Sequence, residues 1–240
     1  MERDMKRDMK RGIKRRLPFI LLLPCLLSTV LLPLSLQAQE RITLADGSVL
    51  NVFMVESRTS DRPSPLVILM GGGPGNASIS RDTSQWLGSG FAQRGWTVAV
   101  PISPNNRSFR GTTNNELIML LVNELQGRED IAEGKVLLAG VSNGGMSALE
   151  IARTDPSRFF GVAAVPALLT ATRANETLKD FPVYLRIGGA DRLGWADRFE
   201  ETVATFNDVG VDLDADILEG APHMFRMDWS TLGPWLEQFD

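Results

Sequence analysis

Short apolar runs of strand length alternate with segments of helical spacing along most of this 240-residue chain. The runs at 66–70, 135–140 and 182–189 are mostly continuous in their apolar character instead of alternating with polar residues. Such strands are typical of a parallel sheet, because helices cover both of its faces. Strand and helix alternate at least four times. We therefore predict an α/β fold, in which βαβ units form a mostly parallel sheet flanked by helices.

Residues 41–57 have a different pattern, with two alternating runs on either side of the pair Asp46-Gly47. An Asp-Gly pair between apolar stretches favours a β-hairpin. We therefore expect antiparallel strands at one edge of the sheet. No linker divides residues 41–240, and we predict a single domain over residues 39–240.

The first 38 residues have the layout of a secretory signal peptide. Eight Lys or Arg residues stand among the first 16, and the run 17–38 that follows is uncharged and ends in Ala38. The run approaches the ~20 residues that can span a membrane, so an uncleaved signal anchor is the alternative. Prolines would interrupt a spanning helix and favour cleavage near Ala38; they are Pro18, Pro24 and Pro33. We expect a secreted or periplasmic protein that contacts a membrane only through this segment, if the segment is uncleaved.

Charge and cysteine content exclude several classes of function. Loss of the first 38 residues removes eight basic and three acidic residues and changes the formal net charge from −4 to −9. No basic stripe remains, so we expect neither nucleic acid nor an anionic membrane surface as a partner. The one cysteine, Cys25, lies in the apolar run. The domain over residues 39–240 therefore has no disulfide and no thiol chemistry.

The stretch KVLLAGVSNGGMSALE, residues 135–150, places Ser142 between a predicted buried strand and a predicted helix. Residues 140–144 match G-x-S-x-G, the nucleophile elbow, in which glycines let strand and helix approach closely. The serine backbone is then strained, and its hydroxyl is raised at the carboxyl end of the sheet, where open α/β sheets bind ligands. A serine in a glycine-rich loop can also be a simple turn residue. The flanking strand and helix favour the nucleophile.

A serine hydroxyl needs a base to become a nucleophile, and the chain has one histidine, His223. It follows the last predicted strand, in a loop from which a base can reach over the strand ends toward Ser142. A lone histidine with a purely structural role is the alternative interpretation.

A carboxylate that orients the imidazole is predicted at Asp191. This residue follows the buried strand 182–189 in a glycine-containing loop, and helix capping is its alternative role. The other candidates lie within a predicted helix or alternate along the last strand, where they indicate a solvated face: Asp197, Asp212, Asp214 and Asp216.

Backbone N–H groups that stabilise a developing negative charge are expected at two places. One is Asn143, directly after Ser142. The other is the region of Gly72 and Gly73 in the loop GGGPGN, which follows a strand and precedes a helix. A flexible turn or a phosphate cradle is the alternative for this loop. It lacks the lysine and Ser/Thr of a P-loop, so we do not expect nucleotide binding.

Ser142, Asp191 and His223 in this order, with GGGPG after an early strand, resemble the α/β-hydrolase superfamily over almost all of residues 41–240. Compact esterases and dienelactone-hydrolase-like or prolyl-oligopeptidase-like members are the most similar. Dienelactone hydrolases use a cysteine, which is absent from the domain. Met70 stands where many members have a histidine before the glycines.

The spacing of the later strands limits what covers the site. Only about 15 residues separate the predicted strands 160–167 and 182–189, too few for the large cap domain of some relatives. We expect an open site, covered if at all by the loop 102–115. Three large side chains are candidates for the pocket, with a core position as the alternative for each: Phe109, Trp195 and Met224.

The resemblance implies a serine hydrolase that cleaves small-molecule carboxylic esters without a metal or cofactor. Ser142 would attack the carbonyl, His223 would act as base and then acid, Asp191 would orient His223, and water would clear the acyl-enzyme. A peptidase or amidase of the same fold is one alternative. A binding protein without catalysis is the other. Met70 and the open site motivate that alternative, whereas the predicted base and acid oppose it.

Overall fold

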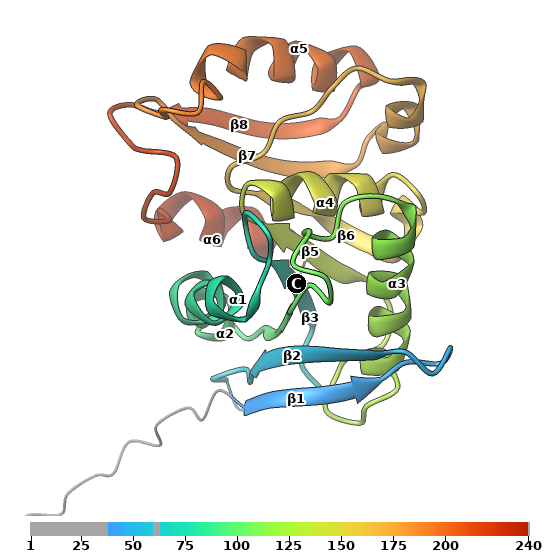
Figure 1. The fold of residues 1–240 in the computed structure, drawn as a ribbon. Helices are drawn as coiled ribbons and strands as arrows, with labels where there is room; N and C mark the ends of the chain where they lie inside the picture. Colours follow the sequence, from blue (N-terminus) through green and yellow to red (C-terminus); the bar gives the residue numbers. More distant parts are fainter. Residues whose placement is uncertain (1–37, 60–62, 240) are drawn as a thin grey trace, which may run out of the picture. The chain divides into compact units, whose positions relative to one another are not determined.

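The computed structural model describes residues 38–59 and 63–239. The predicted signal segment lies outside the described residues, apart from Ala38 in the first strand. Within the described residues, eight strands form one sheet in the order β1-β2-β4-β3-β5-β6-β7-β8 (Figure 1). They are β1 (Ala38–Thr43), β2 (Val49–Val55), β3 (Leu66–Met70), β4 (Thr97–Pro101), β5 (Val136–Gly140), β6 (Phe159–Ala164), β7 (Pro182–Gly188) and β8 (Asp212–Leu218).

The pairing of the strands confirms the predicted fold class. β1 pairs with β2 and β2 with β4 in antiparallel register. The pairings that join β4, β3, β5, β6, β7 and β8 are all parallel. The predicted hairpin is present, with its turn at Asp46 and Gly47. Gly47 has a φ of +83°, and Asp46 Oδ1 accepts hydrogen bonds from the backbone N–H and hydroxyl of Ser48.

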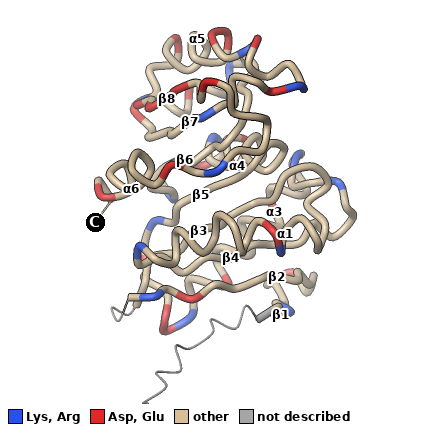
Figure 2. The backbone as a smooth tube through the Cα atoms, turned by 90° about the vertical axis from the view of Figure 1, so that its left-hand side faces the viewer, with Lys and Arg blue, Asp and Glu red and all other residues tan. Residues whose placement is uncertain are grey.

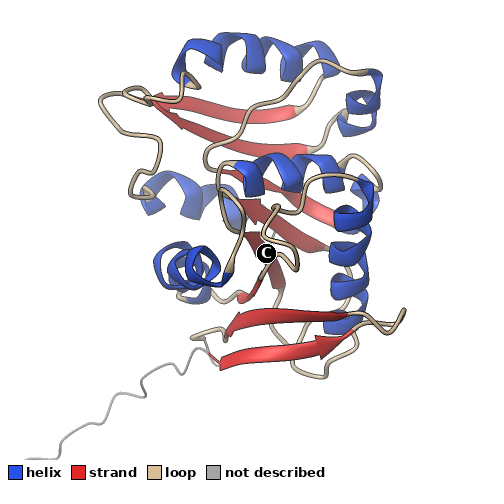
Figure 3. Cartoon of the chain, viewed as in Figure 1, coloured by secondary structure: helices blue, strands red, loops and turns tan. Residues whose placement is uncertain are grey.

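The helices cover both faces of the sheet (Figure 3). They are α1 (Ala77–Thr83), the π-helical turn η1 (Ser84–Gly88), α2 (Ser89–Ala92), α3 (Thr112–Gln126), α4 (Asn143–Ala152), α5 (Phe199–Val209) and α6 (Trp229–Glu237). Short 3-10 turns are η2 (Pro156–Arg158), η3 (Arg173–Leu178) and η4 (Ala196–Arg198).

Alternate residues of each central strand pack into two separate cores. Leu66, Ile68 and Met70 of β3 belong to the core under α3, α4 and α5, whereas Val67 and Leu69 belong to the core under η1, α2 and α6. β3, β4 and β5 are buried at every position. This explains the continuous apolar runs in the sequence, because each side chain of these strands meets a helix layer on one face or the other.

The helix predicted between β3 and β4 contains a π-helical turn that the sequence did not indicate. Thr83 Oγ1 donates to the carbonyl of Ile79, and Ser84 Oγ donates to the carbonyl of Arg81. Hydroxyl groups bonded to carbonyls of the preceding turn compete with the regular i→i−4 ladder. They favour the wider turn that begins at Ser84.

The outer strand β8 is only partly covered. Asp212 and Asp216 are exposed, as predicted for a solvated face, whereas Asp214 is half-buried and pairs with Arg186 Nη2 at 2.9 Å. Acidic residues gather on α5 and β8 (Figure 2). Among the helices that the structure describes, none has both the length and the apolar character needed to cross a membrane.

Candidate active site

Ser142 occupies the turn between β5 and α4, at the carboxyl end of a central strand. Its φ of 56° and ψ of −119° are strained for a residue with a side chain. A Cβ atom at Gly140 would lie 2.3 Å from the backbone of Gly144, and one at Gly144 would lie 2.1 Å from the carbonyl oxygen of Met70. Both glycines of the G-x-S-x-G motif are therefore required by the close approach of the helix to the sheet.

Hydrogen bonds from neighbouring strand ends hold the strained turn in place. The Ser142 N–H donates to the Pro166 carbonyl at 2.8 Å, beyond β6, and the Val141 N–H donates to the Met70 carbonyl at 3.1 Å, at the end of β3. The Ser142 carbonyl accepts from the N–H of Met146 at 3.0 Å and so opens α4. These bonds over-determine the turn, which is how a strained residue persists in a fold.

His223 and Asp191 are joined directly. Nδ1 of His223 lies 2.7 Å from Oδ2 of Asp191, and their side chains are 17% and 0% exposed. The second carboxylate oxygen of Asp191 accepts from the N–H of Leu193 at 2.6 Å. The ring of Trp195 meets the imidazole edge-on, with centroids 4.8 Å apart. When Nδ1–H donates to the carboxylate, Nε2 of the neutral imidazole remains a proton acceptor.

The loops that carry this pair are packed against each other at the end of β7. The Ala190 N–H donates to the Ala221 carbonyl at 2.8 Å. A Cβ atom at Gly188 would lie 2.1 Å from the Pro222 carbonyl oxygen. Glycine at the end of β7 therefore lets the His223 loop cross directly over the strand that delivers Asp191.

The three predicted residues all follow carboxyl ends of parallel strands: Ser142 after β5, Asp191 after β7 and His223 after β8. β6 lies between β5 and β7, so two strand spacings, roughly 10 Å, separate the exits of Ser142 and Asp191. Among the other carboxylates considered, Asp197 lies in η4 and Asp214 pairs with Arg186.

The glycine loop after β3 lies against Ser142. A Cβ atom at Gly72 would lie 3.3 Å from Cβ of Ser142, and Nδ2 of Asn143 donates to the Gly73 carbonyl at 3.1 Å. Within the described residues, none of the backbone N–H groups of Gly72, Gly73 and Asn143 donates a hydrogen bond. Met70, the last residue of β3, is fully buried in the core.

The loop between β4 and α3 is tied to this glycine loop and to α4. The Ser103 N–H donates to the Gly75 carbonyl at 2.8 Å. Glu150 of α4 accepts from Arg110 at 2.9 and 2.7 Å and from the Gly111 N–H at 3.1 Å. The irregular segment ends at Gly111, four residues before the predicted loop end at 115, because α3 begins at Thr112.

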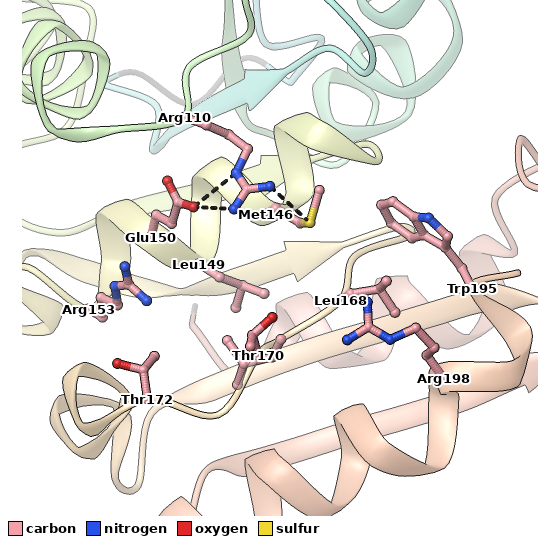
Figure 4. A pocket seen from close by; sticks show the side chains of 11 residues that line it. Arg110, Met146, Leu149, Glu150, Arg153, Leu168, Thr170, Thr172, Trp195 and Arg198 are labelled. Atoms are coloured by element: carbon pink, nitrogen blue, oxygen red, sulfur yellow. Dashed lines mark hydrogen bonds and ion pairs between the residues drawn. The ribbon is translucent and has the colours of Figure 1, made fainter. Parts of the chain in front are cut away.

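A pocket of about 390 Å³ opens beside this arrangement (Figure 4). Trp195, which contacts His223, lines it, as does Met146 from the first turn of α4. The other residues that line the pocket are Arg110, Leu149, Glu150, Arg153, Leu168, Leu169, Thr170, Thr172 and Arg198.

The sequence identified only one of these pocket residues in advance. Trp195 lines the pocket, whereas Phe109 is fully buried in the core and Met224 is 52% exposed and does not line this pocket. A signal was present in α4 and its C-cap, where four lining residues recur at helical spacing after Ser142: Met146, Leu149, Glu150 and Arg153.

In residues 38–59 and 63–239, no group of three or more His, Cys, Asp or Glu side chains is placed to hold a metal ion.

No family model and no curated protein matches the sequence. The structure has many counterparts. A thermostable esterase is 13% identical with a TM-score of 0.57, over 84% of this chain and 60% of that one. Dipeptidyl peptidase 4 of Porphyromonas gingivalis is 13% identical with a TM-score of 0.65, over 84% of this chain and 34% of that one. An esterase of Pyrococcus furiosus is 15% identical with a TM-score of 0.62, over 84% and 91%.

The chain has the α/β-hydrolase fold. The resemblance predicted from the sequence is thereby confirmed at the level of the fold. The identities are too low to carry more than the fold. This member of the fold is compact, because residues 165–181 between β6 and β7 hold only the short turn η3 and no large cap.

Proposed function

We propose that this protein is a serine hydrolase that cleaves carboxylic esters with Ser142, His223 and Asp191. The observation that carries the proposal is the bond between the chain's single histidine and a fully buried carboxylate. A buried carboxylate is costly unless it is paired and hydrogen-bonded. Asp191 lies at the same edge of the sheet as Ser142, which is strained and stands between the motif's two glycines. This placement supports a catalytic role for the buried carboxylate.

In the proposed reaction, Ser142 Oγ attacks the ester carbonyl while Nε2 of His223 takes its proton. Asp191 holds the imidazole in the required tautomer and stabilises the imidazolium that forms. His223 then returns the proton to the leaving alcohol. Water activated by His223 hydrolyses the acyl-enzyme and restores Ser142. This sequence needs neither a metal nor a cofactor.

The negative charge on the carbonyl oxygen is proposed to be stabilised by backbone donors. The N–H of Asn143 is one, and the glycine loop at Gly72 and Gly73 supplies the other. The bond from the Asn143 side chain to the Gly73 carbonyl supports this role, because it ties the two donor segments together beside Ser142. Donors fixed in advance need no reorganisation when the charge develops.

The test is the replacement of Ser142 by alanine, with Ser157→Ala as the matched control. Ser157 is an exposed serine after α4 whose hydroxyl bonds Asp155. Ser142→Ala should lower kcat for 4-nitrophenyl acetate by about 10⁴-fold or more and abolish labelling by a fluorophosphonate probe. Ser157→Ala should change neither. Undiminished turnover in Ser142→Ala would overturn the proposal.

Two other functions are outcomes of the same experiments. A peptidase or amidase of the same fold would use the same three residues, and peptide substrates turned over faster than matched esters would identify one. The similarity to dipeptidyl peptidase 4 motivates this comparison. A protein that only binds its ligand would give neither turnover nor labelling while remaining folded.

We also propose that the protein is exported, with a small-molecule ester as its substrate and no nucleic acid partner. The basic and apolar composition of residues 1–38 supports export. Terminal sequencing of the protein recovered outside the cytoplasm should give Gln39 as the first residue. A retained N-terminus in a membrane fraction would instead support the anchor.

A further inference from the structure

The pocket beside His223 has an unusual combination of linings. One part is apolar, with Leu149, Leu168 and Trp195 among its residues. The rest carries three guanidinium groups, from Arg110, Arg153 and Arg198, and one carboxylate, from Glu150. Figure 4 shows Arg153 and Arg198 on opposite sides of Leu149 and Thr170.

Glu150, the single acid among the lining residues, already accepts hydrogen bonds with both of its carboxylate oxygens. Glu150 Oε1 accepts from both Nε and Nη2 of Arg110, and its other oxygen accepts from the Gly111 N–H. The charges of Arg110 and Glu150 therefore compensate each other. The positive charge that remains in the pocket belongs to Arg153 and Arg198.

These two guanidinium groups are weakly engaged within the described residues. Nη1 of Arg153 lies 3.5 Å from the neutral amide oxygen of Asn175. Nε of Arg198 makes one 3.3 Å contact with Glu201, and both of these side chains are substantially exposed. An exposed ion pair of this kind is screened by solvent and contributes little. Both arginines thus keep donors for a ligand.

The local charge runs against that of the surrounding chain. The chain has a formal net charge of −4, and acidic residues gather on β8 and on α5, which directly follows η4 in the chain (Figure 2). A neighbouring pocket beside Asn143 shares Arg110, Glu150 and Arg153 with this one and adds Arg107. Glu150 is its single acid as well. A positive pocket on an acidic protein attracts anionic ligands by its field as well as by contact.

We propose that the substrate is an ester that itself carries a carboxylate group, bound by one of the two uncompensated arginines on opposite sides of the pocket, Arg153 or Arg198. This inference rests on the proposed function and specifies its substrate class. The planar guanidinium fork matches carboxylate geometry and forms charge-assisted hydrogen bonds. The apolar wall of Leu149, Leu168 and Trp195 covers the carbon chain between the carboxylate and the reacting carbonyl.

The reaction balances without a further reactant. A bond forms between Ser142 Oγ and the ester carbonyl carbon, the bond from that carbon to the alcohol oxygen breaks, and the alcohol leaves with the proton that His223 carried. Water then adds to the acyl-enzyme. The products are an alcohol and two carboxylate groups, of which one was present from the start and remains paired with its arginine throughout.

The experiment compares matched esters with and without the carboxylate. For the acyl side, the pair is the 4-nitrophenyl monoester of adipic acid and its methyl diester; for the alcohol side, it is 4-carboxyphenyl acetate and its methyl ester. The wild-type protein should give a kcat/KM ratio of about 10 or more in favour of the acid in one of these pairs. The pair that gives this ratio shows whether the carboxylate belongs to the acyl part or to the alcohol part of the substrate. Added salt should lower the ratio.

The double variant Arg153→Gln/Arg198→Gln should bring that ratio close to 1, and one of the single variants, Arg153→Gln or Arg198→Gln, should do the same and so identify the arginine that holds the carboxylate. Arg41→Gln is the matched control, an exposed arginine on β1 at the edge of the sheet, and should leave the ratio unchanged. A wild-type ratio at or below 1 in both pairs, or an unchanged ratio in the double variant, overturns the inference. In that case, if the methylated members of the two pairs were still hydrolysed and this hydrolysis required Ser142, the proposed function would stand. No hydrolysis of any ester overturns both.

Discussion

Nδ1 of His223 is 2.7 Å from Oδ2 of Asp191, and the aspartate side chain has no exposed surface. The carboxylate is held from its other side by the N–H of Leu193 at 2.6 Å. Trp195 packs edge-on against the imidazole. The imidazole is thus oriented by a hydrogen bond and by a ring contact, and both come from the loop after β7.

Asp191→Asn should keep a side chain of the same shape beside His223 but remove the negative charge that fixes the tautomer of the imidazole. The amide nitrogen can donate to Nδ1, which stabilises the tautomer that carries its proton on Nε2 and cannot accept one from Ser142. We expect kcat for a neutral ester to fall by about 10³- to 10⁴-fold, on the scale of the equivalent change in other triads. Steady-state kinetics, with circular dichroism as the check on folding, measure the effect.

Asp197→Asn is the control for this substitution, because Asp197 is an exposed aspartate in η4, six residues farther along the chain. Its kcat should stay within about twofold of the wild-type value, as expected for a surface change without a defined role. Equal losses in the two variants would contradict the role proposed for Asp191.

Gly144→Ala should destabilise the fold itself. The new Cβ would lie 2.1 Å from the Met70 carbonyl oxygen and 2.7 Å from that of Gly71. Both are backbone atoms at the end of the central strand β3, so neither can rotate away. We expect the free energy of unfolding to fall by about 3 kcal/mol or more, at the upper end of overpacking effects.

Urea denaturation of Gly144→Ala beside Gly127→Ala would measure this difference. Gly127 caps α3 with a φ of −77°, and a Cβ there would meet only the Glu124 carbonyl at 3.4 Å and that of Asn123 at 4.0 Å. Its replacement should change the free energy by less than about 1 kcal/mol. Similar midpoints for both variants would show that α4 can move away from β3.

The sequence predicted those features in which a local residue pattern is compatible with only one local structure. Continuous apolar runs become buried parallel strands because both faces must be covered. The Asp46-Gly47 pair closes a hairpin because Gly47 takes a φ of +83°. Gly140 and Gly144 mark a close crossing of strand and helix, where any Cβ would overlap backbone atoms.

The pocket could not be predicted in the same way, because it depends on which loops meet. Arg153 and Arg198 are 45 residues apart, and they line one pocket only because the fold brings the end of α4 and η4 to the same hollow. Nothing in the local sequence of Arg198 separates it from a solvated arginine at the start of a helix. Phe109 shows the converse, since a loop aromatic turned inward to the core instead of the pocket.

Glu150→Ala should loosen the loop between β4 and α3. The carboxylate accepts from the Arg110 side chain and from the backbone N–H of Gly111, so its removal leaves that amide without its acceptor. We expect the Gly111 amide to exchange with solvent about 10-fold faster or more, because a single charge-assisted hydrogen bond protects it. The Ser103 amide, bonded to the Gly75 carbonyl, should change less.

Hydrogen exchange read by NMR on Glu150→Ala and on Glu124→Ala would check this expectation. Glu124 is an exposed glutamate on the neighbouring helix α3, and its loss should leave the exchange rate of Gly111 unchanged. Unaltered exchange of Gly111 in Glu150→Ala would mean that the loop is held by its contacts with the glycine loop alone.

Tyr184, the chain's single tyrosine, offers a titration that no other phenol obscures. Burial raises the pKa of its hydroxyl above the ordinary value near 10, while the hydrogen bond with Thr231 at 2.6 Å and the charge of Arg186 partly oppose that rise. The folded state therefore favours the protonated phenol. Above the unfolded pKa, the unfolded chain releases this proton first, and stability is lost as the pH rises toward the folded pKa.

The absorbance of tyrosinate near 295 nm should thus appear at a higher pH in the folded protein than in urea. The free energy of unfolding should fall more steeply above pH 10 in the wild-type protein than in Tyr184→Phe, which has no group to ionise at this position. Below that pH, Tyr184→Phe should be less stable by about 1 kcal/mol, because it lacks the bond to Thr231. Parallel stability curves across pH 9 to 11 would contradict a raised pKa, since lysines titrate equally in both proteins and cannot produce the difference.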